Sequence, residues 1–68
     1  METWTFVTKR CSVRTCKVFI DWIHNNLTSA TKCDILEIPM MKPSVVMITS
    51  DINDITKFKA YLKTITLV

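Results

Sequence analysis

The chain has 68 residues, of which 49% are hydrophobic and 22% charged, with two Pro and no Gly. This length fits one small domain, which we expect to span residues 1–68. The apolar fraction is too high and the net charge of +3 too low for intrinsic disorder. No apolar run approaches the roughly 18 residues of a membrane span. We therefore expect a soluble folded domain.

The cysteine content predicts a reducing compartment. Cys11, Cys16 and Cys33 cannot all pair within the chain, and a disulfide scaffold of this size normally carries more cysteines. We expect an intracellular location, in the cytoplasm, the nucleus or an organelle matrix. High use of Ile, Thr and Lys without Gly indicates a compositionally biased source, viral or organellar.

The first half of the chain predicts a strand followed by a helix. Residues 3–8 alternate Trp4 and Phe6 with threonines, which is typical of a strand with its aromatic face inward. Ser12 is a plausible N-cap for a helix. Its expected apolar face recurs at helical spacing and comprises Val13, Cys16, Ile20, Ile23 and Leu27. A strand over 17–24 is the alternative, but both of its faces would be apolar.

The second half predicts two strands and a closing helix. After a loop at 28–31, residues 33–38 form a strand that ends at Pro39, and the continuous apolar run in 44–49 predicts the central strand. Ser50 or Asp51 caps a second helix with an apolar face. The order β-α-β-β-α predicts an α+β two-layer sandwich, with a three-stranded sheet and two helices on one face.

The sequence gives little indication of a catalytic or metal-binding site. The single histidine, His24, falls on the polar side of the expected helix, away from any Cys or carboxylate, and no Gly is present to form a phosphate loop. The spacing of Cys11 and Cys16 is wider than that of structural zinc pairs. We expect no enzyme activity, no metal and no cofactor.

A resemblance to the thioredoxin fold rests on the order of elements. A strand at 3–8 precedes Cys11 just ahead of a helix, and a Pro-led strand at 42–49 precedes a closing amphipathic helix. That family's active pattern has two residues between its cysteines, whereas four separate Cys11 and Cys16. The resemblance implies a thioredoxin-like domain with degenerate or absent redox activity.

Basic residues near the start of the chain predict a nucleic-acid contact as an alternative function. Arg10, Arg14 and Lys17 are spaced four and three apart and would line one helix face, with Lys9 adjacent. They could contact the phosphates of RNA or DNA.

The leading hypothesis is a protein-interaction role. The apolar inventory exceeds what one small core can hold, and Trp22, Met40 and Met41 are the expected surplus, of residue types favoured at interfaces. The order of elements is similar to that of small subunits of large assemblies, such as the smallest subunit of the transcription and repair factor TFIIH and the Alu-domain proteins of the signal recognition particle. Several folds share this order, so it assigns no family. We expect a non-catalytic subunit or adaptor that docks on a larger protein or on itself, within an oligomeric or ribonucleoprotein assembly.

Overall fold

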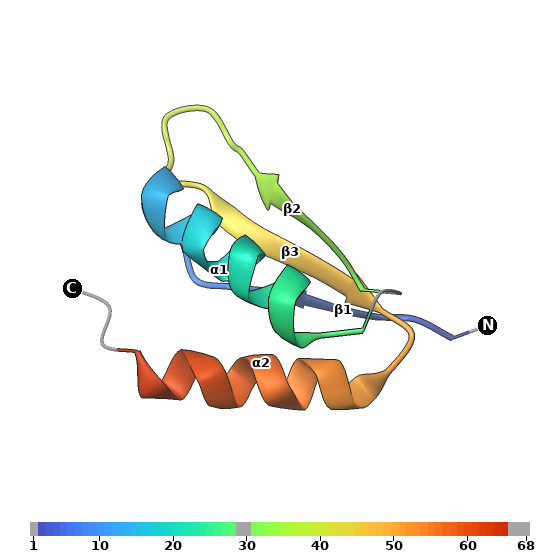
Figure 1. Cartoon of the computed structure of the whole chain (residues 1–68). Coiled ribbons are helices and arrows are strands. Elements are labelled where there is room, and N and C mark those ends of the chain that lie inside the picture. The colour runs from blue at the N-terminus through green and yellow to red at the C-terminus, as the bar shows by residue number, and fades with distance from the viewer. Residues whose placement is uncertain (1, 29–30, 66–68) are drawn as a thin grey trace.

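The computed structural model describes residues 2–28 and 31–65. Within them the chain forms the predicted order of strands and helices (Figure 1), namely β1 (Trp4–Val7), α1 (Val13–Asn26), β2 (Lys32–Leu36), β3 (Ser44–Thr49) and α2 (Ile52–Thr64). The α+β class is confirmed. β2 begins and ends earlier than the predicted 33–38, because the chain turns immediately after this strand. The central residues of the predicted loop at 28–31 lie outside the described residues.

The sheet of the described residues has the order β1-β3-β2, and both neighbouring pairs are antiparallel. β3 is therefore central, as its continuous apolar run predicts. The register places Met47 between Phe6 and Cys33, and all three side chains face the helices. One residue further along each strand, the pleat turns the side chains to the opposite face.

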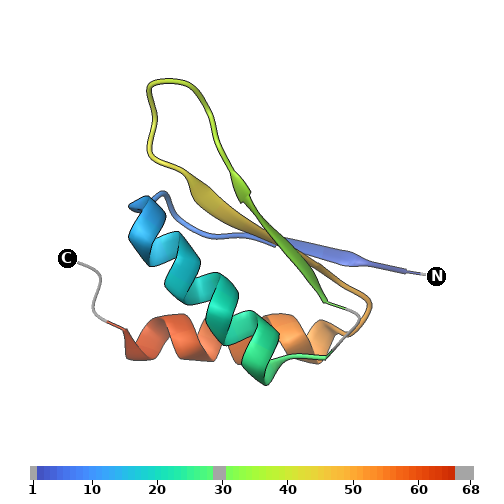
Figure 2. The ribbon, with the colours of Figure 1, turned by 45° about the horizontal axis from the view of Figure 1, so that its top comes forward.

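Both helices pack on one face of the sheet, as Figures 1 and 2 show. α1 begins at the end of the molecule where α2 finishes, so the two helices run in roughly opposite directions (Figure 1). The core between the layers is centred on Phe58 of α2, whose ring makes edge contacts with Phe6 and Phe19 at centroid distances of 5.7 and 6.0 Å. Neither helix of the described residues is long and apolar enough to cross a membrane.

The residues that α1 buries differ from the apolar face expected from the sequence. Ser12 is the N-cap and its hydroxyl accepts a hydrogen bond from the Thr15 N–H at 3.2 Å, as predicted. Cys16, Phe19 and Ile23 are the buried residues of this helix, whereas the expected apolar face left out Phe19 and included Val13, which is 44% exposed. Phe19 lies between Cys16 and Ile23 at helical spacing, and its large ring occupies the space facing α2.

The absence of glycine from the sequence affects the turn that connects β2 and β3. The Met41 N–H donates to the Ile38 carbonyl at 3.1 Å, which closes a tight turn after β2. Pro39 takes the second position of this turn and Met40 the third, with φ at 64°. This is the pattern of a type II turn, whose third position normally carries Gly. Holding Met there costs on the order of 1 kcal/mol.

A buried carboxylate ties the two halves of the chain together. Asp54, in the first turn of α2, is fully buried, and its Oδ2 accepts hydrogen bonds from three threonine hydroxyls. Thr28 donates at 2.9 Å and Thr49, the last residue of β3, donates at 2.8 Å. The third donor, Thr31, directly precedes β2. Thr28 and Thr31 are thereby fixed to the end of β3 and the start of α2.

The charge of Asp54 is maintained by this cluster. Burial raises the pKa of the Asp54 carboxyl, but the hydroxyls of Thr31, Thr49 and Thr28 lower it by more, so the pKa lies below its ordinary 3.8. The N-terminal end of α2 also favours a negative charge at this position. Because the folded-state pKa is depressed, the ionised carboxylate stabilises the fold above the ordinary pKa, and this contribution is lost as the pH falls through the folded-state pKa.

We predict that Asp54→Asn lowers the free energy of unfolding at neutral pH by at least about 2 kcal/mol, because the amide brings unpaired N–H groups into a buried site. Below the ordinary pKa the difference between the two proteins shrinks, because the unfolded chain takes up the proton there first, and it is gone below the folded-state pKa of Asp54. Urea unfolding as a function of pH measures this difference. Asp21→Asn, an exposed carboxylate on α1, serves as the control and should shift stability by less than about 0.5 kcal/mol. An equal effect of both variants would contradict the role given to the cluster.

Candidate functional site

The face of the sheet that the helices leave uncovered is the most extensive candidate surface. We call it the open sheet face. Its residues alternate with those that face the core, and comprise Thr5 and Val7 of β1, Lys32, Asp34 and Leu36 of β2, and Ser44, Val46 and Ile48 of β3. In the register, Ile48 lies between Thr5 and Lys32.

Large apolar side chains are exposed on the open sheet face. Val7 is 47% exposed, Leu36 43% and Ile48 40%, one from each strand of the sheet. Val46 lies beside Val7 in the register and is half-buried. A half-solvated antiparallel sheet usually carries polar residues on its outer face. Contiguous apolar side chains there instead favour contact with another protein.

The predicted docking residues lie apart from one another. Trp22 is in the second half of α1, whereas Met40 and Met41 occupy the turn between β2 and β3. Met41 borders a hollow of about 430 Å³ that Val13 also lines, nine residues before Trp22 on the same helix. Nine residues of helix span about 13 Å. The structure therefore does not join the three residues into one surface. Met40 is fully exposed and Met41 about half exposed.

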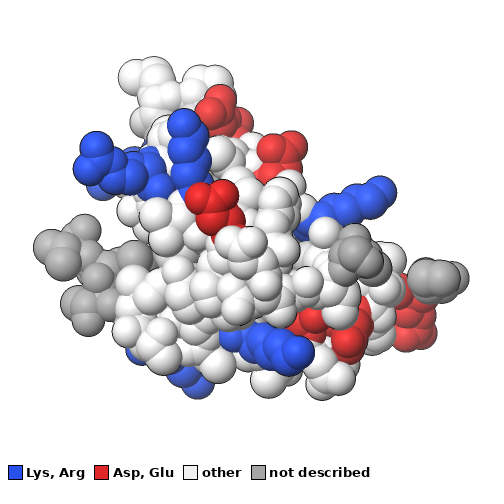
Figure 3. Space-filling model, in the orientation of Figure 1, with Lys and Arg blue, Asp and Glu red and all other residues white. Residues whose placement is uncertain are grey.

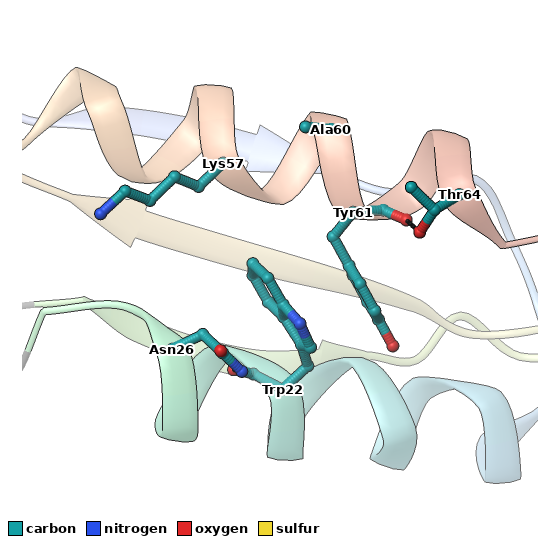
Figure 4. A pocket seen from close by; sticks show the side chains of 6 residues that line it. All are labelled: Trp22, Asn26, Lys57, Ala60, Tyr61 and Thr64. Atoms are coloured by element: carbon teal, nitrogen blue, oxygen red, sulfur yellow. Dashed lines mark hydrogen bonds between the residues drawn. The ribbon is translucent and has the colours of Figure 1, made fainter.

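Trp22 packs between the two helices. Its ring stacks on Tyr61 of α2, with centroids 4.3 Å apart and planes 11° from parallel, and lies 5.9 Å from Phe58. Figure 4 shows the open side of this contact, a shallow hollow of about 510 Å³. Two of its polar side chains are already bonded to their own helices: Asn26 donates to the Trp22 carbonyl and Thr64 to the Tyr61 carbonyl. Among the residues that the structure describes, Lys57 is the one charged side chain that lines this hollow.

The predicted basic residues separate into two groups. Lys9 and Arg10 line a groove of about 880 Å³ at the start of α1, whereas Arg14 and Lys17 are exposed on α1 and do not line it. Sequence analysis missed the other cations of this groove, which are Lys42, Lys59 and Lys63. They come from elements that meet only in the fold, and no local spacing signals their proximity.

Cys11 and Cys16 are adjacent at the start of α1. Their Sγ atoms are 3.2 Å apart and both residues are buried. They precede and follow the N-cap at the positions of a hydrophobic staple, which fixes the entry of the chain into the helix. Burial, together with the neighbouring Cys11 thiol, raises the pKa of Cys16 to about 11. Cys16 is therefore a protonated thiol at neutral pH, unlike the reactive thiolates of redox enzymes.

His24 has a cysteine neighbour that the sequence did not suggest. Its Nε2 lies 3.3 Å from Sγ of Cys33, because the end of α1 packs beside β2. Burial and the nearby Asp34 raise the pKa of Cys33. A raised pKa disfavours the thiolate that nucleophilic catalysis requires. Among residues 2–28 and 31–65, no three metal-binding side chains gather at one point.

Comparison with known proteins gives no family assignment. No protein-family model matches the chain, and no curated protein or solved structure matches it significantly. The function must be argued from the surfaces described above.

We predict that Trp22→Ala lowers the free energy of unfolding by about 3 kcal/mol, because it removes the indole stacked between the helices. Thermal or urea unfolding measures this loss. Tyr61→Phe keeps the stacked ring and should cost less than about 0.5 kcal/mol. If Trp22→Ala instead leaves stability intact and abolishes association with a partner, Trp22 is the interface residue predicted from the sequence.

Proposed function

We propose that this protein is a non-catalytic interaction subunit that docks on a protein partner, within a larger assembly, through its open sheet face. The observation that carries the proposal is the exposure of Val7, Leu36 and Ile48 on the solvent side of all three strands. Removing these apolar groups from water favours association.

The size of the domain fits this role. An interface of standard size takes about 800 Å² from each partner. That area is about one sixth of the 5018 Å² accessible surface of the described chain. One face of a two-layer domain is a large share of its surface, so docking there would bury a substantial fraction of the molecule.

The charges of the open sheet face favour a second copy of this chain as the occupant in the isolated protein. Lys32 and Asp34 lie two residues apart on β2, so the face carries one charge of each sign. In a two-fold symmetric contact each side presents the same patch to the other. Lys32 of one copy can then oppose Asp34 of its partner while the apolar side chains meet.

The unpaired edges of the sheet offer a second surface on which another chain can dock. β1 and β2 are the outer strands, and each pairs with β3 on one side only. An unpaired edge can add a strand from another chain, and charged side chains and short length limit this tendency. β1 is only four residues long. We therefore place the main contact on the face of the sheet.

We predict that the isolated chain forms a dimer with a dissociation constant below about 100 μM, measured by sedimentation equilibrium. Ile48→Asp should weaken the dimer by at least about 30-fold, because it puts a charge among the apolar side chains of the contact. Ile48→Thr keeps strand propensity, and it serves as the milder variant if the aspartate disturbs folding.

Val18→Asp is the matched control for this experiment. Val18 is 50% exposed, as Ile48 is 40% exposed, but it lies on α1 and not on the sheet. The control should leave the dimer intact. A monomer at all concentrations, or equal loss of association in both aspartate variants, would contradict the proposal.

A further inference from the structure

The groove at the start of α1 concentrates positive charge. Five of the nine Lys and Arg residues line it, and no acidic side chain does. Figure 3 shows several Lys and Arg side chains at the upper left of the view, over the start of α1, while acidic side chains appear at the top and centre of the view and at its lower right. We call this groove, lined by Lys9, Arg10, Lys42, Lys59 and Lys63, the basic groove.

The fold brings these cations together from three segments. The Cys11 N–H donates to the Pro43 carbonyl at 2.8 Å, which holds the connection after β1 against the start of β3. Lys42 therefore lies near Lys9 and Arg10. Lys59 and Lys63 come from α2, one helical turn apart, so their side chains are about 6 Å apart along that helix.

The start of α1 adds to the positive potential. This helix has 14 residues and no acid in its first turn, so its positive end faces the groove without compensation. The hydroxyls at this end are already engaged: Thr8 accepts from the Val45 N–H, and Ser12 from the Thr15 N–H. The five cations are thus the principal polar groups that the groove offers to a ligand.

An apolar floor accompanies the charges. Phe6, Leu62 and Ile65 line the groove and are only partly buried. The Lys59 ammonium lies 5.6 Å from the centre of the Phe6 ring. An aromatic ring beside a cation suits a nucleotide, since a base can stack while its phosphate meets the charge.

We propose that the basic groove binds a single strand of nucleic acid, with Lys9, Arg10, Lys42, Lys59 and Lys63 contacting phosphates and Phe6 contacting a base. The composition of the groove favours this ligand over an acidic peptide. Phe6 lines the groove beside the Lys59 ammonium, and its ring offers a stacking surface to a base, which an acidic peptide does not have. Val7 lines both the basic groove and the open sheet face, whereas Ile48 does not line the groove.

The test is fluorescence anisotropy of a labelled oligothymidylate of about twelve nucleotides, titrated with the full chain between about 50 and about 200 mM salt. Each phosphate contact on a single strand contributes about 0.7 to the slope of log affinity against log salt. Five contacts set an upper limit of about 3.5 for this slope. Lys59→Glu with Lys63→Glu should weaken binding at low salt at least about tenfold and reduce the slope by about 1.4.

Lys32→Glu with Lys57→Glu is the matched control. It changes the net charge equally, but neither residue lines the groove. It should keep the affinity within about twofold of wild type. If both double variants lose the same oligonucleotide affinity, the loss comes from the change in net charge alone, and the proposed site is overturned. Absence of binding at about 100 μM protein and low salt would also overturn it.

Two further arms identify the ligand class. Phe6→Leu should weaken oligothymidylate binding at least about fivefold and leave inorganic polyphosphate binding unchanged, because only the oligonucleotide has bases to stack. A polyglutamate peptide that binds the groove more tightly than the oligonucleotide would overturn the nucleic-acid proposal in favour of an acidic protein segment. Ile48→Asp should leave the oligonucleotide affinity unchanged. Failure of the sheet-face proposal can therefore be distinguished from failure of the nucleic-acid proposal. Circular dichroism confirms that each variant is folded.

Discussion

The arrangement of both layers depends on the buried carboxylate of Asp54. Three threonine hydroxyls converge on its Oδ2, from the end of α1, the start of β2 and the end of β3. A small chain without disulfides has little surplus stability, and a charged group buried without partners would be strongly destabilising. The threonines make the burial tolerable, and in doing so they fix the position where α2 begins. Both helices then share one side of the sheet.

Placing both helices on one side has two consequences for function. It leaves the other face of the sheet uncovered, with apolar residues such as Ile48 in contact with solvent. It also brings the start of α1 beside the end of α2, where Lys59 and Lys63 meet the basic connection after β1. The molecule therefore presents an apolar face, for which we propose a protein partner, and a basic groove, for which we propose a single strand of nucleic acid. A subunit of a ribonucleoprotein assembly could use both surfaces at the same time.

Local patterns predicted the elements well, because strands and helices are determined by neighbours in sequence. The alternation around Phe6, the cap at Ser12 and the apolar run of β3 each identify an element without tertiary information. The candidate functional surfaces were harder to predict from the sequence. Trp22 looked surplus because no sequence pattern shows that Tyr61 stacks on it. Two of the five cations of the groove, Lys9 and Arg10, were among the basic residues singled out in the sequence, whereas the other three join them only through the fold.

The central claim is that the open sheet face is the docking surface, and the most direct test is a methyl NMR spectrum of the chain over a series of protein concentrations. We expect the methyl signals of Val7, Leu36 and Ile48 to shift or broaden together as the concentration rises, while those of Val18 on α1 remain unchanged. Shifts centred on Val18, or spectra independent of concentration, would contradict it.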